Sequence, residues 1–411
     1  MPFDPSRPFD VAIAGAGLAG ASLALRLGRS GARVALVDAA TFPRDKLCGE
    51  FLSPESWGVL GRLGLADDVD RLGYHPIRRV RLSTPRGRVI DAEFAPAGSP
   101  PGIGLSRSAL DTLLVDRGRA AGVAVVEGTR VGGPIIEEGR VVGIAGRHAE
   151  AGRVEIRARV VVAADGRHSR LVDATGRSRV RSLFRPRLFG LKRHLEIDGP
   201  ADFEAEGTVG LHLVPGGYAG TCRVEGGIVN VCALIPEAAA RASRGDLDRV
   251  AGDHLASNPS IARLWGAGRP CGPWKTVSGV RVESATPALA GILYAGDCRG
   301  TVDPLGGQGM TMALLGAEVL APFVASAVAA GTAGRTLQRA YDDAWHARFI
   351  RRITLCRAFH HALLHPALID LASRRPREAE NFLARCFDWT RDRTRRDRDG
   401  GRSSLGRARG S

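Results

Sequence analysis

The chain of 411 residues is 44% hydrophobic and 25% charged, with a formal net charge of +15, which is the composition of a globular protein of two or three domains. Only three of its 58 basic residues are lysine and the arginines are spread along the chain, so the charge does not mark a nucleic-acid-binding face. No lysine follows a glycine, which excludes a G-x-x-x-x-G-K phosphate loop, and the seven cysteines contain no C-x-x-C pair, which argues against a zinc site.

Residues 11–38 carry the first informative pattern. A short apolar strand is followed by the sequence G-x-G-x-x-G, formed by Gly15, Gly17 and Gly20. A helical pattern and a second apolar strand follow, and this strand ends at Asp38. In such a β-α-β unit the glycines permit a tight turn and a close approach of a pyrophosphate to the helix N-terminus, while the acidic residue accepts hydrogen bonds from a free ribose. The unit therefore predicts a bound dinucleotide, FAD or NAD rather than NADP.

Two later motifs share one form, an apolar strand that ends in an acidic residue. Residues 160–164 end at Asp165 and Gly166, and residues 291–296 end at Asp297. A turn that opens onto a helix follows the second motif, and its candidate cofactor-binding residues are Pro304, Gly306, Gly307, Gln308, Gly309 and Met310. Backbone N–H groups at the N-terminus of that helix can stabilise negative charge on a cofactor.

These three motifs, in this order, resemble the flavoprotein hydroxylase superfamily with the para-hydroxybenzoate hydroxylase-like fold, which also includes the geranylgeranyl reductase family and flavin-dependent halogenases. The resemblance covers about residues 8–385. It implies that the dinucleotide is FAD, that Asp297 contacts its ribityl chain or pyrophosphate, and that the turn beginning at Pro304 lies along the flavin ring. It also implies that Asp165 belongs to a motif used for FAD and nicotinamide, and that Arg107 contacts FAD.

The segment 44–50 points to a particular reaction. It has the form R-x-K-x-C-G-E, which looks like a signature of the geranylgeranyl reductases, whose cysteine lies near the flavin. This implies that Arg44 and Lys46 bind FAD and that Cys48 is a candidate catalytic proton donor, since nearby cations favour the thiolate; a packing role for Cys48 remains open. Gln308 points the other way, because its G-G-Q-G-M turn resembles aromatic hydroxylases. One motif thus indicates reduction of a double bond and the other indicates oxygenation.

We expect an FAD-dependent, NAD(P)H-using monooxygenase that acts on an apolar aromatic or polyketide-like small molecule in secondary metabolism. The alternative is an FAD-dependent reductase of prenyl or other alkene double bonds. In both reactions FAD carries the chemistry and the protein supplies binding and electrostatics. The sequence contains no second β-α-β fingerprint, so NADPH or NADH is expected to bind only transiently as reductant.

The domain organisation follows from changes in the pattern along the chain. Residues 178–280 contain short alternating strands, which predict an antiparallel-sheet substrate domain. The predicted α/β fold is a Rossmann-like FAD-binding domain in two parts, residues 8–177 and 281–334, interrupted by that sheet and followed by C-terminal helices at 335–390 and a disordered basic tail at 391–411. The candidate substrate-lining residues are Phe189, His212, Tyr218 and Trp274.

The apolar stretch 310–331 contains Glu318 and Pro322, so we expect a buried helix rather than a membrane span. The N-terminus lacks the pattern of a signal peptide, and the odd number of cysteines suits a reducing compartment. We therefore expect a cytoplasmic enzyme, monomeric or homodimeric, that acts on a small molecule. No metal, nucleic-acid partner or stable membrane insertion is expected.

Overall fold

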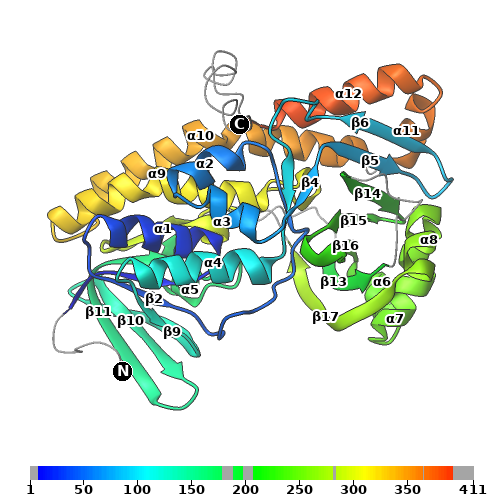
Figure 1. Ribbon diagram of the computed structural model, residues 1–411. Coiled ribbons are helices and arrows are strands. Elements are labelled where there is room, and N and C mark those ends of the chain that lie inside the picture. Colours follow the sequence, from blue (N-terminus) through cyan, green and yellow to red (C-terminus); the bar gives the residue numbers. More distant parts are fainter. Residues whose placement is uncertain (1–7, 178–187, 198–206, 281–283, 364, 392–411) are drawn as a thin grey trace, which may run out of the picture.

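The computed structural model describes residues 8–177, 188–197, 207–280, 284–363 and 365–391. Figure 1 shows a sheet formed by the N-terminal part of the chain beside a second sheet formed mainly by its middle part. Long helices of the C-terminal part extend along both. This is the predicted mixed α/β architecture with a helical C-terminus.

The first sheet is built around the predicted β-α-β unit. Its strand order is β8-β2-β1-β11-β10-β9, and β19 also pairs with β11. Its parallel strands are β1 (Phe9–Ala14), β2 (Val34–Val37), β8 (Ala124–Val126), β11 (Gly152–Ala163) and β19 (Ile292–Tyr294). β9 (Thr129–Glu137) and β10 (Arg140–His148) form an antiparallel hairpin that pairs with the first half of β11. β2, β19 and the last four residues of β11 are apolar and buried on both faces, and β1 is buried except at Asp10, as expected for a sheet covered on two sides.

Helices cover one face of this sheet. α1 (Leu18–Arg29) packs between α4 (Arg107–Ala120) and α9 (Gly309–Ala329). Gly31 follows α1 with a φ of +84°, a conformation that favours glycine and ends the helix at the predicted place. Among the described residues, α9 is the one helix that is long and apolar enough to cross a membrane. It packs into the hydrophobic core beside α1, so its apolar character is explained by burial within the protein.

The second sheet has the order β17-β13-β16-β15-β14-β5-β6. Its strands are β5 (Arg79–Ser83), β6 (Val89–Glu93), β13 (Leu188–Glu196), β14 (Thr208–Val214), β15 (Gly217–Arg223), β16 (Val229–Pro236) and β17 (Arg269–Val280). β13 to β16 form within residues 178–280, where alternating strands were expected, and their pairing is antiparallel. The sheet is not confined to residues 178–280, because β5 and β6 come from the first FAD-binding segment and β5 pairs in parallel with β14.

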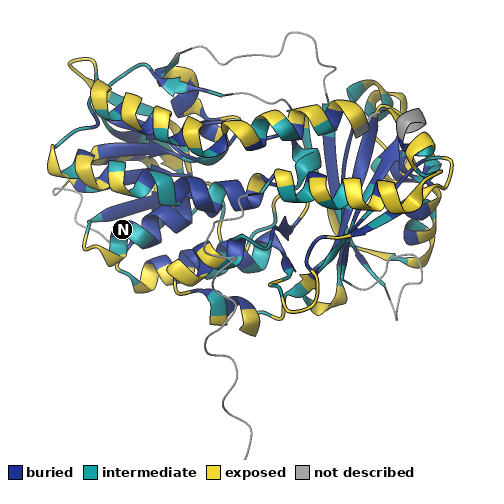
Figure 2. Ribbon diagram, turned by 90° about the horizontal axis from the view of Figure 1, so that it is seen from above, coloured by how far each residue is buried: buried dark blue, intermediate teal, exposed yellow. Residues whose placement is uncertain are grey.

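Within the described part of the C-terminal region, the helices are α10 (Arg335–Leu363), α11 (Pro366–Ala372) and α12 (Pro376–Trp389). α10 packs against α9, and α12 packs against β6 of the second sheet. Figure 2 shows the strands buried between helices whose outer faces are exposed. The shorter elements are α2 (Ser56–Arg62), α3 (Ala66–Arg71), α5 (Arg170–Thr175), α6 (Glu237–Ala242), α7 (Leu247–Arg249), α8 (Pro259–Ala267), β3 (Phe51–Leu52), β4 (His75–Ile77), β7 (Gly102–Gly104), β12 (Gly176–Arg177) and β18 (Thr286–Pro287).

Candidate active site

The glycine-rich turn between β1 and α1 has the backbone that a dinucleotide site needs. Gly15 has a φ of +99°, and a Cβ there would lie 2.4 Å from the carbonyl oxygen of Ala164. A Cβ on Gly20 would lie 1.9 Å from the carbonyl oxygen of Gly15, so a side chain is excluded at both positions. A Cβ on Gly17 would instead point toward the guanidinium groups of Arg107 and Arg44, at 3.6 and 3.8 Å. The turn therefore has the close packing of the fingerprint and a backbone surface that faces two cations.

These two arginines are fixed by a carboxylate that the sequence analysis did not single out. Arg107 donates two hydrogen bonds to Asp111, of 3.0 and 2.7 Å, and Arg44 donates one of 2.7 Å to the same carboxylate. Burial disfavours the charge of Arg107, but Asp111 outweighs it and raises the pKa of Arg107. Arg107 thus stays cationic, and both guanidinium groups lie beside Gly17, where a pyrophosphate fits. The spacing of Arg107 and Asp111, four residues apart on α4, was the available sequence signal.

Asp38 lies at the end of β2 as predicted. Its carboxylate accepts hydrogen bonds from the backbone N–H of Ala16, at 2.7 Å, and of Ala40, at 2.8 Å. It therefore helps to hold the glycine-rich turn and stands at the position where the fingerprint places the ribose contact.

The other two motifs meet next to this turn. Asp165 and Asp297 both line one cavity, and burial raises the pKa of Asp165. The thiol of Cys298 joins them, because its sulfur accepts from the N–H of Gly166 at 3.2 Å and lies 3.3 Å from Asp165. Cys298 is thus accommodated by contacts with the Asp165 motif.

Arg299, the residue after Cys298, is fully buried behind the same loop. It pairs with Asp342 at 2.9 Å and lies over the ring of Trp345, 4.4 Å from its centroid. Both partners belong to α10. The bulky side chain therefore points away from the cavity and leaves the path of the loop unobstructed.

The turn before α9 forms the opposite wall of the cavity. Pro304, Gly306, Gly307, Gly309 and Met310 line it, with Gly307 at a φ of +61°. The first turn of α9 directs backbone N–H groups toward this end of the fold, as expected for a helix N-terminus that faces a cofactor.

Gln308 differs from its neighbours because it does not line the cavity. Its side chain is fully buried, donates to the carbonyl of Gly306 at 3.3 Å and accepts from Arg352 at 3.1 Å. Arg352 lies on α10 and also binds Glu55 at 2.9 Å. Gln308 therefore fixes the turn to the C-terminal helices, and its contact with the cofactor, expected through the backbone of the turn, stays a prediction.

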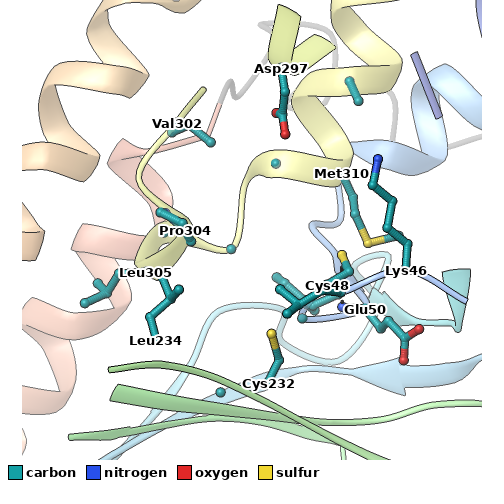
Figure 3. A pocket seen from close by; sticks show the side chains of 18 of the residues that line it. Lys46, Cys48, Glu50, Cys232, Leu234, Asp297, Val302, Pro304, Leu305 and Met310 are labelled. Atoms are coloured by element: carbon teal, nitrogen blue, oxygen red, sulfur yellow. Dashed lines mark hydrogen bonds between the residues drawn. The ribbon is translucent and has the colours of Figure 1, made fainter. Parts of the chain in front are cut away.

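The cavity has a volume of about 610 Å³ and joins the cofactor-binding motifs to the second sheet. In Figure 3, Cys48, Met310, Pro304 and Leu305 surround one space, with Cys232 and Leu234 of β16 on the side of the second sheet. The cofactor end is polar, with Arg107, Lys46 and Asp165 among its lining residues. Enclosure by surrounding atoms and the charges of Arg107 and Arg44 lower the pKa of Lys46. The opposite end is apolar and is lined by Val80, Leu211, Tyr218, Leu234, Val277 and Phe387.

A buried ionic cluster fixes the segment that carries Cys48. Lys192, on β13, is 1% exposed and donates to Asp45 at 2.5 Å and to Glu50 at 2.7 Å. Glu50 is fully buried, accepts from the N–H of Arg107 at 2.9 Å and lies 2.6 Å from the ring nitrogen of His194. Burial opposes the charge of Lys192, but Glu50 and Asp45 outweigh it and raise its pKa. The cluster ties the Cys48 segment to the second sheet. This cluster could not be predicted from the sequence, because Lys192 lies more than a hundred residues along the chain from Asp45 and Glu50.

The predicted substrate-lining residues divide into two groups. Tyr218 lines the cavity. Phe189 and Trp274 do not, since they pack with the core between the second sheet and α6 to α8, where Trp274 stacks on Trp265. His212 is also buried away from the cavity, with its ring nitrogens 2.8 Å from Ser83 and 3.0 Å from Thr221. These three predictions are corrected, because alternation along a strand reveals two faces but not which one meets the ligand.

Comparisons with known proteins agree with this geometry. Residues 8–185 match the model of an FAD binding domain. The chain is 27% identical over 357 residues to a digeranylgeranylglycerophospholipid reductase of Methanoculleus marisnigri, covering 82% of each chain. It is 36% identical over 171 residues to a 6-methylpretetramide 4-monooxygenase of Streptomyces rimosus, covering 41% of this chain and 40% of that one.

A solved structure has the same fold. The geranylgeranyl bacteriochlorophyll reductase-like protein of Thermoplasma acidophilum superposes with a TM-score of 0.73 at 22% identity, covering 87% of this chain and 88% of that one. The residues around Gly17, Arg107 and Asp297 fit FAD, because they provide an open backbone turn, two fixed cations and a polar cavity wall. The chain is therefore an FAD-binding oxidoreductase that is similar to geranylgeranyl reductases and to a flavin-dependent monooxygenase.

Proposed function

We propose that the protein is an FAD-dependent reductase of isolated double bonds in a prenylated or similarly apolar substrate. The observation that carries this proposal is the placement of Cys48. Two sequence motifs pointed to different reactions. Cys48, from the motif that favours reduction, lines the cavity, whereas Gln308, from the motif that favours oxygenation, does not. Gln308 is engaged with Arg352 behind the turn, so its resemblance to hydroxylases concerns loop construction rather than the groups that face a substrate.

The chemistry that bound FAD would supply, once it had been reduced by NADPH or NADH, is the transfer of a hydride to one carbon of the alkene. The protein must then supply one proton to the neighbouring carbon, so that the alkene gains two hydrogen atoms in all. Cys48 is the proposed donor, through its Sγ–H. Arg107 lies beside the sulfur of Cys48, and the thiolate that remains regains a proton from water. The ionic cluster of Lys192, Glu50 and Asp45 holds the Cys48 segment in place for this transfer.

The cavity supports an apolar substrate. Its walls away from the cofactor end are aliphatic and aromatic, and such surfaces exclude water from the reacting groups. The relative from Methanoculleus marisnigri, named for a reductase of a prenylated phospholipid, matches over most of both chains and supports the same class of substrate.

A second candidate is a monooxygenase of an aromatic or polyketide-like molecule, the reaction first expected from the sequence. The match to 6-methylpretetramide 4-monooxygenase favours it, although that match covers less than half of the chain. The use of NADPH or NADH, a role in secondary metabolism, cytoplasmic location and a monomeric or homodimeric state stay predictions.

Product mass separates the two reactions. The purified protein, with FAD verified by its absorbance, is incubated with NADPH or NADH and either a prenylated lipid or a phenolic polyketide, with and without oxygen. Reduction predicts a product that gains two hydrogen atoms without oxygen. A product that gains one oxygen atom, formed only in air, would establish the monooxygenase instead. A protein that binds no FAD would contradict both.

A further inference from the structure

One face of α10 packs against the turn that forms the wall of the cavity before α9. Arg352, Cys356 and His360 are spaced four residues apart on this helix, so their side chains project from the same face. All three are buried, and none of them lines the cavity. We call these three residues the α10 stripe. It lies behind the turn, on the side away from the cavity.

The α10 stripe contacts the turn at three points. Its arginine binds Gln308, as described above. The sulfur of Cys356 would lie 2.6 Å from a Cβ on Gly306, so the helix packs closely against this glycine. The third point is the pair of His360 and Asp303, whose Nδ1 and Oδ1 atoms lie 2.8 Å apart. The turn is therefore held from behind along its whole length.

Asp303 places a buried carboxylate directly next to the cavity wall. It is fully buried and precedes Pro304, which lines the cavity. Its Oδ1 also accepts from the backbone N–H of Leu305 at 3.2 Å, which fixes the side chain to the turn. A buried charge is weakly screened, so its field extends to neighbouring groups. The pKa of Tyr218, a cavity-lining residue of β15, is raised mainly by burial and further by the charge of Asp303.

This negative charge opposes the effect of the helix that follows the turn. The N–H groups at the N-terminus of α9 favour electrons that are added to a cofactor, whereas a carboxylate on the same turn disfavours them. The ring N–H of His360 donates a hydrogen bond to that carboxylate and so offsets part of its charge. The balance at the cofactor therefore depends on a histidine that does not itself reach the cavity.

We propose that His360 is a positioning residue that acts through Asp303: its hydrogen bond weakens the negative field of this carboxylate at the cofactor and raises the reduction potential of bound FAD. This inference goes beyond the proposed function, because it concerns the cofactor and holds whether the substrate is reduced or oxygenated. The two proposals therefore fail independently. The product mass decides the reaction, and the potential decides the role of His360.

The reduction potential of bound FAD tests this proposal without a substrate. It is measured on the purified full-length protein at neutral pH, by anaerobic equilibration with a reference dye. His360→Leu removes the donor and should shift the equilibrium about tenfold toward oxidised FAD, which is about 30 mV for a two-electron couple. His360→Gln keeps an N–H donor and should lie between this variant and the wild type. Asp303→Asn removes the charge itself and should shift the equilibrium toward reduced FAD.

A double variant shows whether the histidine acts through the carboxylate. In the Asp303→Asn background, His360→Leu should cause no further shift, because no charge remains to be offset. His365→Leu is the matched control, since His365 is an exposed histidine between α10 and α11. It should keep the wild-type potential. Thermal unfolding and FAD absorbance verify that each variant is folded and loaded with cofactor.

Several results would overturn the proposal. An unchanged or raised potential in His360→Leu would exclude the expected effect, and additive shifts in the double variant would exclude action through Asp303. Lower stability of the His360 variants with wild-type potentials would assign the pair to folding alone. If His360→Leu does not retain FAD, the other two single variants decide, and wild-type potentials in both His360→Gln and Asp303→Asn would refute the proposal.

Discussion

Replacing Lys192 by methionine is expected to destabilise the protein far more than an ordinary lysine substitution. Its ammonium group is buried between two carboxylates, 2.5 Å from Asp45 and 2.7 Å from Glu50. Removing one partner of a buried ion pair leaves an uncompensated charge and typically costs about 3–5 kcal/mol. Methionine has a similar length and adds no polar atom, so most of the change is electrostatic.

The free energy of unfolding at neutral pH measures this effect, from denaturant curves followed by circular dichroism and flavin fluorescence. Lys275→Met is the matched control, since Lys275 is the cross-strand neighbour of Lys192 on β17 and is only half-buried. It should cost about 1 kcal/mol or less. The double variant Lys192→Met with Glu50→Gln removes both charges and should be more stable than Lys192→Met alone.

The pH dependence has a definite sign. The pKa of Lys192 in the folded protein lies above its ordinary value of 10.5. The pair therefore contributes fully at pH values below 10.5, and its contribution is lost as the pH rises through the raised pKa. A loss of less than about 1 kcal/mol in Lys192→Met, or a double variant no more stable than the single one, would refute the view that charge pairing holds this cluster.

Three further predictions follow from the site and its supports. Gly17→Ala should leave the FAD-free protein folded, because the added Cβ has only ordinary contacts at 3.6 and 3.8 Å, but it should weaken FAD binding by about tenfold or more. Gly20→Ala, the comparison variant, should instead impair folding. If Gly17→Ala bound FAD as tightly as the wild type, the placement of the pyrophosphate at Gly17 would be contradicted. Cys48→Ala should keep its FAD and lose about 100-fold or more in turnover, with Cys48→Ser intermediate, whereas unchanged kinetics would assign Cys48 to packing. Burial lowers the pKa of His212 to about 3, below its ordinary 6.5, so the contribution of its neutral form to the free energy of unfolding is present above pH 6.5. About 2 kcal/mol of that free energy should be lost between pH 7 and pH 5 in the wild-type protein, and His212→Asn should lack this loss. If the free energy of unfolding changed with pH equally in both proteins, this role of His212 would be excluded.

The cofactor site was the part most accessible from the sequence. Gly15, Gly17 and Gly20 act through the backbone, and their spacing alone fixes the turn, so no knowledge of distant residues was needed. Asp165 and Asp297 were found for the same reason, since each ends an apolar strand and the ends of parallel strands meet at one edge.

The substrate side depends on contacts that sequence spacing does not encode. Gln308 was placed correctly along the chain, but its side chain turns to Arg352 on a helix that follows much later. Lys192 gave no local signal because its partners lie on a separate segment. Arg391 falls at the first position of the segment expected to be a disordered tail, yet it is held against Phe387 by the end of α12.

The hairpin of β5 and β6 has a consequence for protein engineering. Because these two strands leave the nucleotide-binding segment to complete the sheet that surrounds the ligand, neither half of the molecule corresponds to one continuous stretch of chain. A chimera that exchanged only residues 178–280 with a relative would pair a β14 from the relative with the β5 of this chain. Transfer of a new specificity therefore requires that residues 79–93 and the neighbouring α12 be exchanged together with the central strands.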